Sequence, residues 1–217
     1  MNFDQQSYQQ NCKRQHFLLT NDKMIRSSLL YELDKRCGGD PNTKIIEELG
    51  IKHGEARIDI AVVNGIIHGY ELKSERDTLN RLPEQIKTYN AVLDQVTLVV
   101  GKNHLYEAIK IVPEWWGITL AKADNQKGSV IFYTIRLADL NPEQNNTAIA
   151  ALLWRDEALH ILEEIGKADG VRSKNRQVIY ERLAQVLDQD ILRQKVRQQL
   201  RTRVNWRSGL QCMPSGG

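Results

Sequence analysis

Residues 57–73 read RIDIAVVNGIIHGYELK, and this stretch decides the expected fold. Two runs rich in isoleucine and valine flank the Asn64-Gly65 pair, which is a strong hairpin signal. The returning run carries two charges, Glu71 and Lys73, on one face of a strand whose other residues look ready for burial. Buried charges are costly unless they are paired or bind a metal, so the pair either faces water or is there for chemistry.

The length of the hairpin loop decides whether Asp59 joins these two charges. With a strict two-residue turn, Asp59 would lie opposite Tyr70 and face away from Glu71. With a three-residue loop, Val63 would pair with Ile67. Asp59 would then lie directly across from Glu71. Three-residue loops with a glycine in the left-handed conformation are common, and a bulge would have the same effect, so we predict the second register.

Asp59, Glu71 and Lys73 together suggest phosphodiester chemistry. Two neighbouring carboxylates repel each other, and a divalent cation relieves the repulsion. Mg²⁺ (or Mn²⁺) prefers hard oxygen ligands and needs only one or two carboxylates besides water and substrate phosphate. Metal-bound water is a better nucleophile, and Lys73 would orient that water or neutralise developing charge. We therefore expect Asp59 and Glu71 to bind metal.

A helix from about Pro83 to Leu93 is expected to follow the hairpin, because proline suits the first helical turn. Gln85 and Tyr89 are four residues apart, so they share one face of this helix. An amide and a phenol can hydrogen-bond phosphate or metal-bound water. Tyr89 also fits an apolar stripe and Gln85 could simply face solvent, so this pair is a supporting candidate.

The remaining pattern predicts an α/β domain followed by a helical module. Polar composition predicts a flexible tail over residues 1–20, and the stretch NPEQNNT from Asn141 reads as a linker between an α/β domain at 21–140 and helices at 147–217. Within the first domain, we expect helices over 24–35, 83–93 and near 103–110, strands over 43–51, 56–63, 66–73 and 95–101, and two edge strands before residue 140.

The motif D-x(11)-E-x-K on a hairpin, with Q-x-x-x-Y on the next helix, resembles the PD-(D/E)XK nuclease superfamily, particularly its RecB-like branch. Over residues 45–121, the segments RIDIAVVNG, HGYELKSERDTLNRLPEQIKTYN and VTLVVGKNH are most similar to an uncharacterised bacterial family in that superfamily, and less closely to MmcB-type DNA repair proteins. The resemblance implies a restriction-endonuclease-like mixed sheet flanked by helices. It also implies a Mg²⁺-dependent DNA nuclease, acting in DNA repair or in phage or mobile-element defence.

Residue by residue, the resemblance assigns catalytic positions to Asp59, Glu71 and Lys73 and supporting positions to Gln85 and Tyr89. The sequence departs from it at residue 58, an isoleucine where the superfamily often has proline. The superfamily usually supplies a further glutamate from its first helix, which makes Glu32 the natural candidate. Glu48 and Glu55 are rivals, and we favour Glu48 as a third metal ligand.

Basic residues point to nucleic acid in combination with this core. Arg76 follows the E-x-K directly and is a candidate phosphate contact. Residues 166–217 contain eleven Lys and Arg against four Asp and Glu, and a basic loop between predicted helices carries the further candidates Lys167, Arg172, Lys174 and Arg176. A solvated helical face would carry the same charges, so a catalytically inactive nuclease-fold protein that binds nucleic acid or a protein partner remains the alternative.

Four other residues are considered as site candidates, and packing is the preferred interpretation of three of them. His53 sits in a turn beside the expected site and could contact phosphate. His68 should face the opposite side of its strand from Glu71, so we interpret it as packed rather than as a ligand. Trp115 and Trp116 could stack on unpaired bases, but packing on the sheet is the simpler interpretation.

The composition limits the classes of protein to which this chain can belong. The 217 residues, 41% hydrophobic and 26% charged with a net charge of +3, are ordinary for a soluble globular chain. No apolar run approaches membrane-spanning length and the N-terminal stretch is polar, so we expect a cytoplasmic bacterial protein without a membrane partner. Cys12, Cys37 and Cys212 fit no metal or redox spacing and are expected to be free thiols. The sequence leaves a homodimer open.

Overall fold

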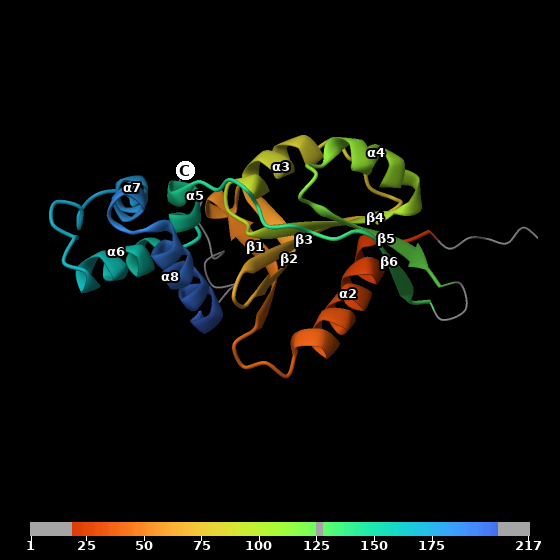
Figure 1. Ribbon diagram of the computed structural model, residues 1–217, viewed down its shortest axis with the longest axis horizontal. Coiled ribbons are helices and arrows are strands. Elements are labelled where there is room, and N and C mark those ends of the chain that lie inside the picture. Colours follow the sequence, from red (N-terminus) through yellow and green to blue (C-terminus); the bar gives the residue numbers. More distant parts are fainter. Residues whose placement is uncertain (1–18, 125–127, 204–217) are drawn as a thin grey trace, which may run out of the picture.

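The computed structural model describes residues 19–124 and 128–203, which form a six-stranded sheet with helices on both faces and a group of C-terminal helices (Figure 1). The strands are β1 (Lys44–Ile51), β2 (Ala56–Val63), β3 (Ile67–Lys73), β4 (Gln95–Gly101), β5 (Gly117–Ala123) and β6 (Val130–Arg136). The helices are α2 (Asp22–Cys37), α3 (Leu82–Asn90), α4 (Leu105–Ile111), α5 (Asn146–Ala150), α6 (Arg155–Glu164), α7 (Arg176–Val186) and α8 (Gln189–Thr202). The predicted mixed sheet with flanking helices and a C-terminal helical module is confirmed.

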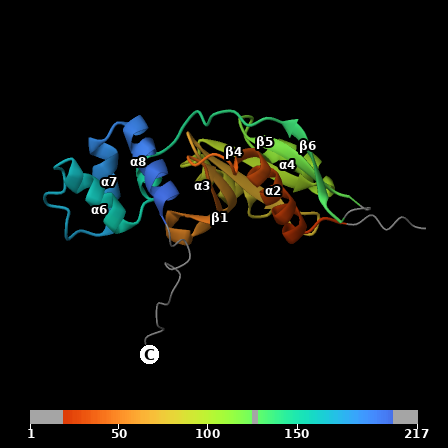
Figure 2. The ribbon, with the colours of Figure 1, turned by 90° about the horizontal axis from the view of Figure 1, so that it is seen from below.

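The strands follow one another across the sheet in the order of the sequence. β1–β2, β2–β3 and β5–β6 pair antiparallel, whereas β3–β4 and β4–β5 pair parallel. Parallel neighbours need a crossover connection, and α3 and α4 provide the two crossovers. Both helices therefore lie on one face of the sheet, while α2 covers part of the other face (Figures 1 and 2).

The hairpin between β2 and β3 has the predicted three-residue loop. Val63 pairs with Ile67, which leaves residues 64–66 as the loop. The pairing runs to Ile60 and Tyr70, so Asp59 and Glu71 are the next residues beyond its far end. The register is thus as predicted, but its expected cause is not: Gly65 does not adopt the left-handed conformation, and Asn64 closes the loop, with its N–H donating to the Ile66 carbonyl and its Oδ1 accepting from the Ile66 N–H.

Two groups of buried side chains hold the sheet between its helices. The smaller lies between α2 and one face, and Ile25, Leu29 and Leu33 supply it from the α2 stripe at intervals of four residues. The larger lies under α3 and α4 and continues into α5–α8 without interruption. Because the larger core is shared, the C-terminal helices pack onto the α/β domain.

The predicted linker is held in place by its own amides. Asn141 Nδ2 donates to the carbonyls of Asn90 and Leu93 at 2.7 and 2.8 Å, and Gln144 Nε2 donates to the carbonyl of Val92 at 2.8 Å. The Asn90 carbonyl ends α3, where a helix leaves acceptors without internal partners, and the carbonyls of Val92 and Leu93 lie just beyond it. The polar composition that suggested a linker thus serves as a cap, and α5 begins at Asn146.

Two boundaries differ from the sequence prediction. α3 ends at Asn90 rather than Leu93, because the N–H groups of both Val92 and Leu93 donate to the carbonyl of Tyr89 and close a final tight turn. Thr20, placed in the predicted tail, is fully buried and its N–H donates to Glu75 Oε2 at 2.8 Å. Residues 1–18 with Cys12, and residues 204–217 with Cys212, lie outside the described residues.

The sequence also predicted free cysteine thiols and no membrane-spanning segment. Cys37 is half-buried and carries a free thiol, as predicted. Among the helices of residues 19–124 and 128–203, none is long and apolar enough to cross a membrane.

We predict that Gly101→Ala lowers the free energy of unfolding by about 1–3 kcal/mol, measured by urea denaturation. Gly101 ends β4 beside the loop that follows β3, and a Cβ there would lie 2.7 Å from the backbone nitrogen of Glu75, which cannot rotate away. Gly65→Ala is the control, since nothing lies within 4 Å of a Cβ at that position. Its expected change is within about 0.5 kcal/mol. Equal destabilisation by both substitutions would contradict this packing.

Candidate functional site

A pocket of about 820 Å³ opens where β2 and β3 meet the first turns of α3. Asp59, Glu71 and Lys73 line it from the sheet, and Gln85 and Tyr89 line it from α3. The three predicted catalytic residues and the two predicted supporting residues therefore share one pocket. The i, i+4 spacing on α3 places Gln85 and Tyr89 side by side above the sheet, as expected.

Glu71 lies deep in this pocket and is 2% exposed. Its Oε1 accepts hydrogen bonds from Lys73 Nζ and from Gln85 Nε2, both at 2.6 Å. The Tyr89 hydroxyl lies 2.8 Å from Glu71 Oε2. Burial, and next the charge of Asp59, raise the pKa of Glu71 against the opposing attraction of Lys73. The carboxylate is thus in surroundings that disfavour its negative charge.

Lys73 is 5% exposed and is paired with Glu71. A buried ion pair contributes little net stability compared with apolar residues of the same size, because both charges lose their hydration. Removing one partner is strongly destabilising, because it leaves the other charge buried and uncompensated. The two side chains therefore depend on each other for their burial.

Asp59 lies where the sheet opens. Its Oδ2 accepts a hydrogen bond from the backbone N–H of Leu72 at 2.7 Å, so the side chain replaces a strand-to-strand bond at the end of the hairpin. On the other side, Glu48 of β1 has a φ of 55°, a left-handed conformation that is unusual for glutamate in a strand. The backbone is thus distorted on the β1 side of Asp59, as is common at functional sites.

Arg26 of α2 was missed by the sequence analysis. Its Nη2 lies 2.7 Å from Asp59 Oδ1, its Nη1 lies 3.0 Å from Glu48 Oε1, and its Nε lies 3.2 Å from Asp22 Oδ2. Burial alone would lower the pKa of the guanidinium, but hydrogen bonds to Asp22 and Asp59 outweigh it and raise that pKa. In sequence, Arg26 is an ordinary helix residue four positions after Asp22, and only the packing of α2 on the sheet shows its role.

The oxygen atoms of this pocket fit a hard divalent cation. Asp59, Glu71 and Glu48 all line it. Glu71 Oε1 already accepts two hydrogen bonds, but Glu71 Oε2 and the two oxygens of Asp59 have capacity for a further interaction. Gln85 Oε1 is buried and has no hydrogen-bond partner among the described residues, so a water or ligand is needed to satisfy it. No three His, Cys, Asp or Glu side chains in the described part are arranged to hold a metal as they stand, but Mg²⁺ keeps several waters and needs fewer protein ligands.

The three candidates for a further acidic ligand, Glu32, Glu48 and Glu55, lie in two different pockets. Glu55 lines the same pocket as Asp59, as does Glu48. Glu32, the candidate on the first helix, instead lines a pocket on the opposite face of the sheet, so it cannot act with Glu71. The expectation for Glu32 is therefore wrong, because the face of α2 that carries it points away from the hairpin charges.

The aromatic candidates pack inside the protein. Trp116 is fully buried and its Nε1 donates to Asn90 Oδ1 at 2.9 Å, while Trp115 is partly buried against the same core. The packing interpretation of both tryptophans is thus confirmed. His53, at a φ of 60° in the turn after β1, stacks on Tyr180 of α7 with 5.5 Å between ring centroids. This stack joins the rim of the pocket to the C-terminal helices.

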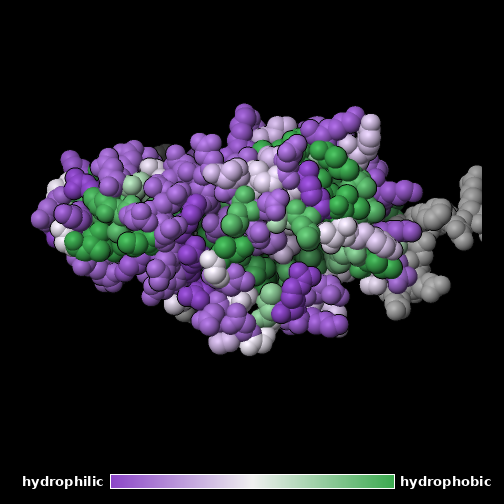
Figure 3. Space-filling model, viewed as in Figure 1, coloured by the Kyte–Doolittle hydropathy of each residue, from purple (hydrophilic) through white to green (hydrophobic). Residues whose placement is uncertain are grey.

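Most of the predicted basic residues lie on exposed surface. Lys167, Lys174, Arg176 and Arg76 are exposed, and hydrophilic residues cover most of the visible surface of the C-terminal helices (Figure 3). Arg172 differs because its guanidinium pairs with Asp169 at 2.7 Å and with Glu163 at 3.4 Å. Arg172 is therefore engaged within the protein, whereas neither Lys174 nor Arg176 forms a side-chain hydrogen bond or ion pair with another described residue.

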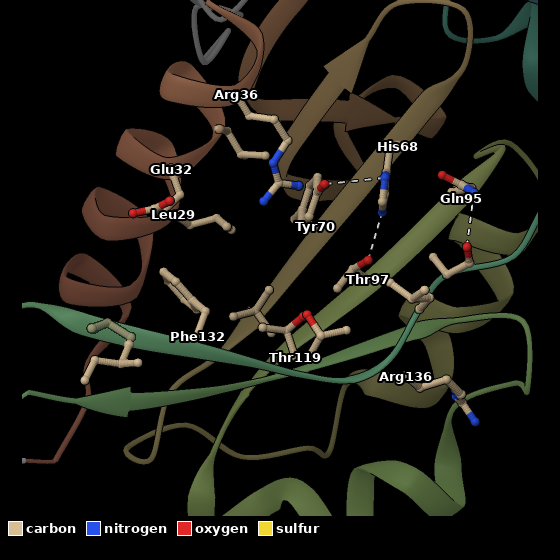
Figure 4. Close-up of a pocket in the computed structure, with 17 residues that line it drawn as sticks. Leu29, Glu32, Arg36, His68, Tyr70, Gln95, Thr97, Thr119, Phe132 and Arg136 are labelled. Carbon is tan, nitrogen blue, oxygen red and sulfur yellow. Dashed lines mark hydrogen bonds between the residues drawn. The ribbon is translucent and has the colours of Figure 1, made fainter.

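A second pocket, of about 630 Å³, lies on the opposite face of the sheet beside α2 (Figure 4). His68 lines it, as the strand alternation predicted, with its Nε2 2.8 Å from Thr97 Oγ1 and its ring stacked on Tyr70 (Figure 4). Burial, followed by the charge of Arg36, lowers the pKa of His68 from 6.5 to about 4. His68 is thus a neutral packed side chain, in agreement with its interpretation from sequence.

We predict that His68 makes the protein less stable in acid. The unfolded chain takes up a proton near pH 6.5 that the folded chain takes up only near pH 4, so this stability is complete above pH 6.5 and is lost as the pH falls toward 4. Between pH 7 and 4.5, the free energy of unfolding should fall by about 2 kcal/mol more in the wild type than in His68→Asn. His160→Gln, at an exposed position, should keep the wild-type pH dependence. Identical pH profiles for wild type and His68→Asn would contradict the assignment.

Fold and site together define a mixed α/β protein with a buried carboxylate–lysine pair and a second carboxylate at one end of its sheet. The chain belongs to the bacteriophage P4 protein cII family, whose model matches residues 16–211. It is 26% identical over 148 residues to protein cII of Enterobacteria phage P4, an alignment that covers 68% of this chain and 55% of that protein. The chain thus spans about half the length of this relative.

Among solved structures, the chain is similar to the SPO1766 protein of unknown function from Silicibacter pomeroyi. The TM-score is 0.40 at 16% sequence identity, and the match covers 70% of this chain and 94% of that one.

Proposed function

We propose that this protein is a metal-dependent deoxyribonuclease that hydrolyses phosphodiester bonds with Mg²⁺ or Mn²⁺. The observation that carries the proposal is the convergence of Asp59, Glu71 and Lys73 on one pocket, where α3 adds Gln85 and Tyr89. Two neighbouring carboxylates, one of them buried and with a raised pKa, repel each other, which is unfavourable. A cation bound between them would remove this repulsion.

Each residue has a role that its contacts support. Asp59 and Glu71, with Glu48 at the rim, would hold the cation, which supplies Lewis-acid stabilisation of the phosphate and an activated water. Lys73 Nζ, fixed 2.6 Å from Glu71 Oε1, is held at the edge of these carboxylates, where it can orient water or donate to a phosphate oxygen. The unpartnered Gln85 Oε1 can accept a hydrogen bond from that water.

The rim of the pocket suits a polyanionic substrate. Lys52, Arg57 and Arg81 line the pocket around its acidic centre. Positive side chains around a carboxylate pair would attract the phosphate backbone and leave the centre free for a divalent cation. DNA is the proposed partner and the cytoplasm the proposed location. The family of a phage protein favours a phage or mobile-element setting over general DNA repair.

We predict that Asp59→Asn and Lys73→Met each reduce DNA cleavage at least about 100-fold, because each removes a group that acts on the reacting phosphate. Supercoiled plasmid and linear DNA would be incubated with purified protein and Mg²⁺, Mn²⁺ or EDTA, and products followed on gels. Thermal melting would verify that each variant is folded. Glu84→Gln is the matched control, since Glu84 is an exposed carboxylate of the same pocket that pairs with Lys87.

Cleavage by the wild type that persists in EDTA, or full activity of the Lys73 variant, would overturn the hydrolytic proposal. Loss of activity in Glu84→Gln alone would place the chemistry elsewhere in the pocket.

A second candidate function is nucleic-acid binding without hydrolysis. It is favoured by the fact that the carboxylates already have cationic partners, Asp59 with Arg26 and Glu71 with Lys73. This alternative requires salt-sensitive DNA binding that survives Asp59→Asn and needs no metal.

Under either function, we predict that Lys174→Gln with Arg176→Gln weakens DNA binding and reduces the slope of log affinity against log salt by roughly 2, or about 1 for each positive charge withdrawn from a phosphate. Fluorescence anisotropy with labelled duplex at several salt concentrations would measure the slope. Arg172→Gln should change the slope less, because its guanidinium is committed to Asp169 and Glu163. A larger effect from Arg172 than from the double substitution would contradict this assignment.

A further inference from the structure

The guanidinium of Arg26 is enclosed by oxygen atoms at the edge of the candidate site. Four hydrogen bonds and one further ion pair engage it. Nε and Nη2 reach the two oxygens of Asp22 at 3.2 Å each, Nη1 reaches Glu48 Oε1 and the carbonyl of Asp59 at 3.0 Å each, and Nη2 reaches Asp59 Oδ1 at 2.7 Å. The side chain is 18% exposed, so these contacts are made largely out of water.

The acceptors around Arg26 are the kind that a divalent cation prefers. They are three carboxylates and one backbone carbonyl, all hard oxygen donors, and Asp22, Glu48 and Asp59 also line the pocket that holds Glu71. One positive charge faces three negative charges, so the surroundings remain negative after Arg26 has paired. A metal ion that binds Asp59 and Glu48 must therefore compete with Arg26 for the same oxygens.

We propose that Arg26 is a positioning residue that acts as a resident cation in the metal-free protein. It holds Asp59 and Glu48 in place for the metal, and it gives up at least one of these carboxylates when the metal binds. Arg26 thus lowers the affinity of the site for Mg²⁺ and Mn²⁺ while it keeps the ligands organised. This inference rests on the proposed function only in that the pocket takes a divalent cation.

A purely structural role for Arg26 makes a different prediction. If Arg26 only fastens α2 to the sheet, its removal would destabilise the fold and disorder Asp59, and metal affinity would stay the same or fall. If it competes with the metal, its removal would destabilise the metal-free protein and raise metal affinity. Stability and metal affinity then move in opposite directions, which separates the two roles.

The test measures Mn²⁺ binding by isothermal titration calorimetry and by the electron paramagnetic resonance signal of free Mn²⁺, on the full chain without DNA. Arg26→Gln should bind Mn²⁺ at least about tenfold more tightly than the wild type, because the nearest competing charge is gone. Its melting temperature should be lower than wild type without metal and should rise more when Mn²⁺ is added. Lys23→Gln removes a charge from an exposed position of the same helix and should leave affinity unchanged.

Arg26→Lys is the second variant, and it keeps the charge while it loses the planar five-donor geometry. Its Mn²⁺ affinity should fall between those of wild type and Arg26→Gln, and it provides the comparison if Arg26→Gln does not fold. Unchanged or weaker Mn²⁺ binding in both Arg26 variants would overturn this inference and leave the nuclease proposal intact. If neither the wild type nor any of the variants binds Mn²⁺, this inference is also overturned. The nuclease proposal would then be decided separately, by whether the wild type cleaves DNA in a metal-dependent way.

Discussion

Glu71 and Lys73 form an ion pair whose side chains are 3% and 6% exposed, and the local structure around them is organised to make that burial tolerable. The pair lies two residues apart on β3, so both side chains enter the same face of the sheet. From α3, Gln85 donates a further hydrogen bond to the carboxylate and the Tyr89 hydroxyl lies 2.8 Å from its other oxygen. Because Tyr89 is also a fully buried core residue, the packing of α3 and the arrangement of the carboxylate cannot change independently.

The sheet on the other side of this pair is distorted. The side chain of Asp59 accepts a hydrogen bond from a backbone N–H of β3, and Glu48 on β1 adopts a left-handed backbone conformation. A regular sheet would have buried or splayed these carboxylates, whereas the distortion turns them toward Arg26 and the pocket. The charge at the site is thus divided into two units, a deep pair of Glu71 with Lys73 and a shallower group around Arg26. The deep pair has its hydrogen bonds fixed by the core, while the shallower group borders the pocket.

Turn signals and helical periodicity predicted the features of the site that depend only on residues close together in the sequence. The Asn64-Gly65 turn gave the register that brings Asp59 and Glu71 together, and helical periodicity gave the shared face of Gln85 and Tyr89. The contribution of Arg26 and the position of Glu32 on the far face of the sheet both depend on how α2 crosses the sheet. No spacing in the sequence encodes that crossing. The contacts of the predicted linker were not foreseen for a related reason, since Asn141 and Gln144 bind carbonyls about fifty residues away.

The C-terminal helices gain significance from where they attach. His53, in the turn beside the pocket, stacks on Tyr180, and the charge of Arg176 on the same helix helps to lower the pKa of His53 after burial. A neutral His53 can pack against Tyr180 without the cost of a second positive charge next to Arg176. The exposed basic side chains at the start of α7 are thereby fixed relative to Lys52 and Arg57 at the pocket rim. Since the two regions share one hydrophobic core, the basic start of α7 and the pocket rim belong to one packed unit.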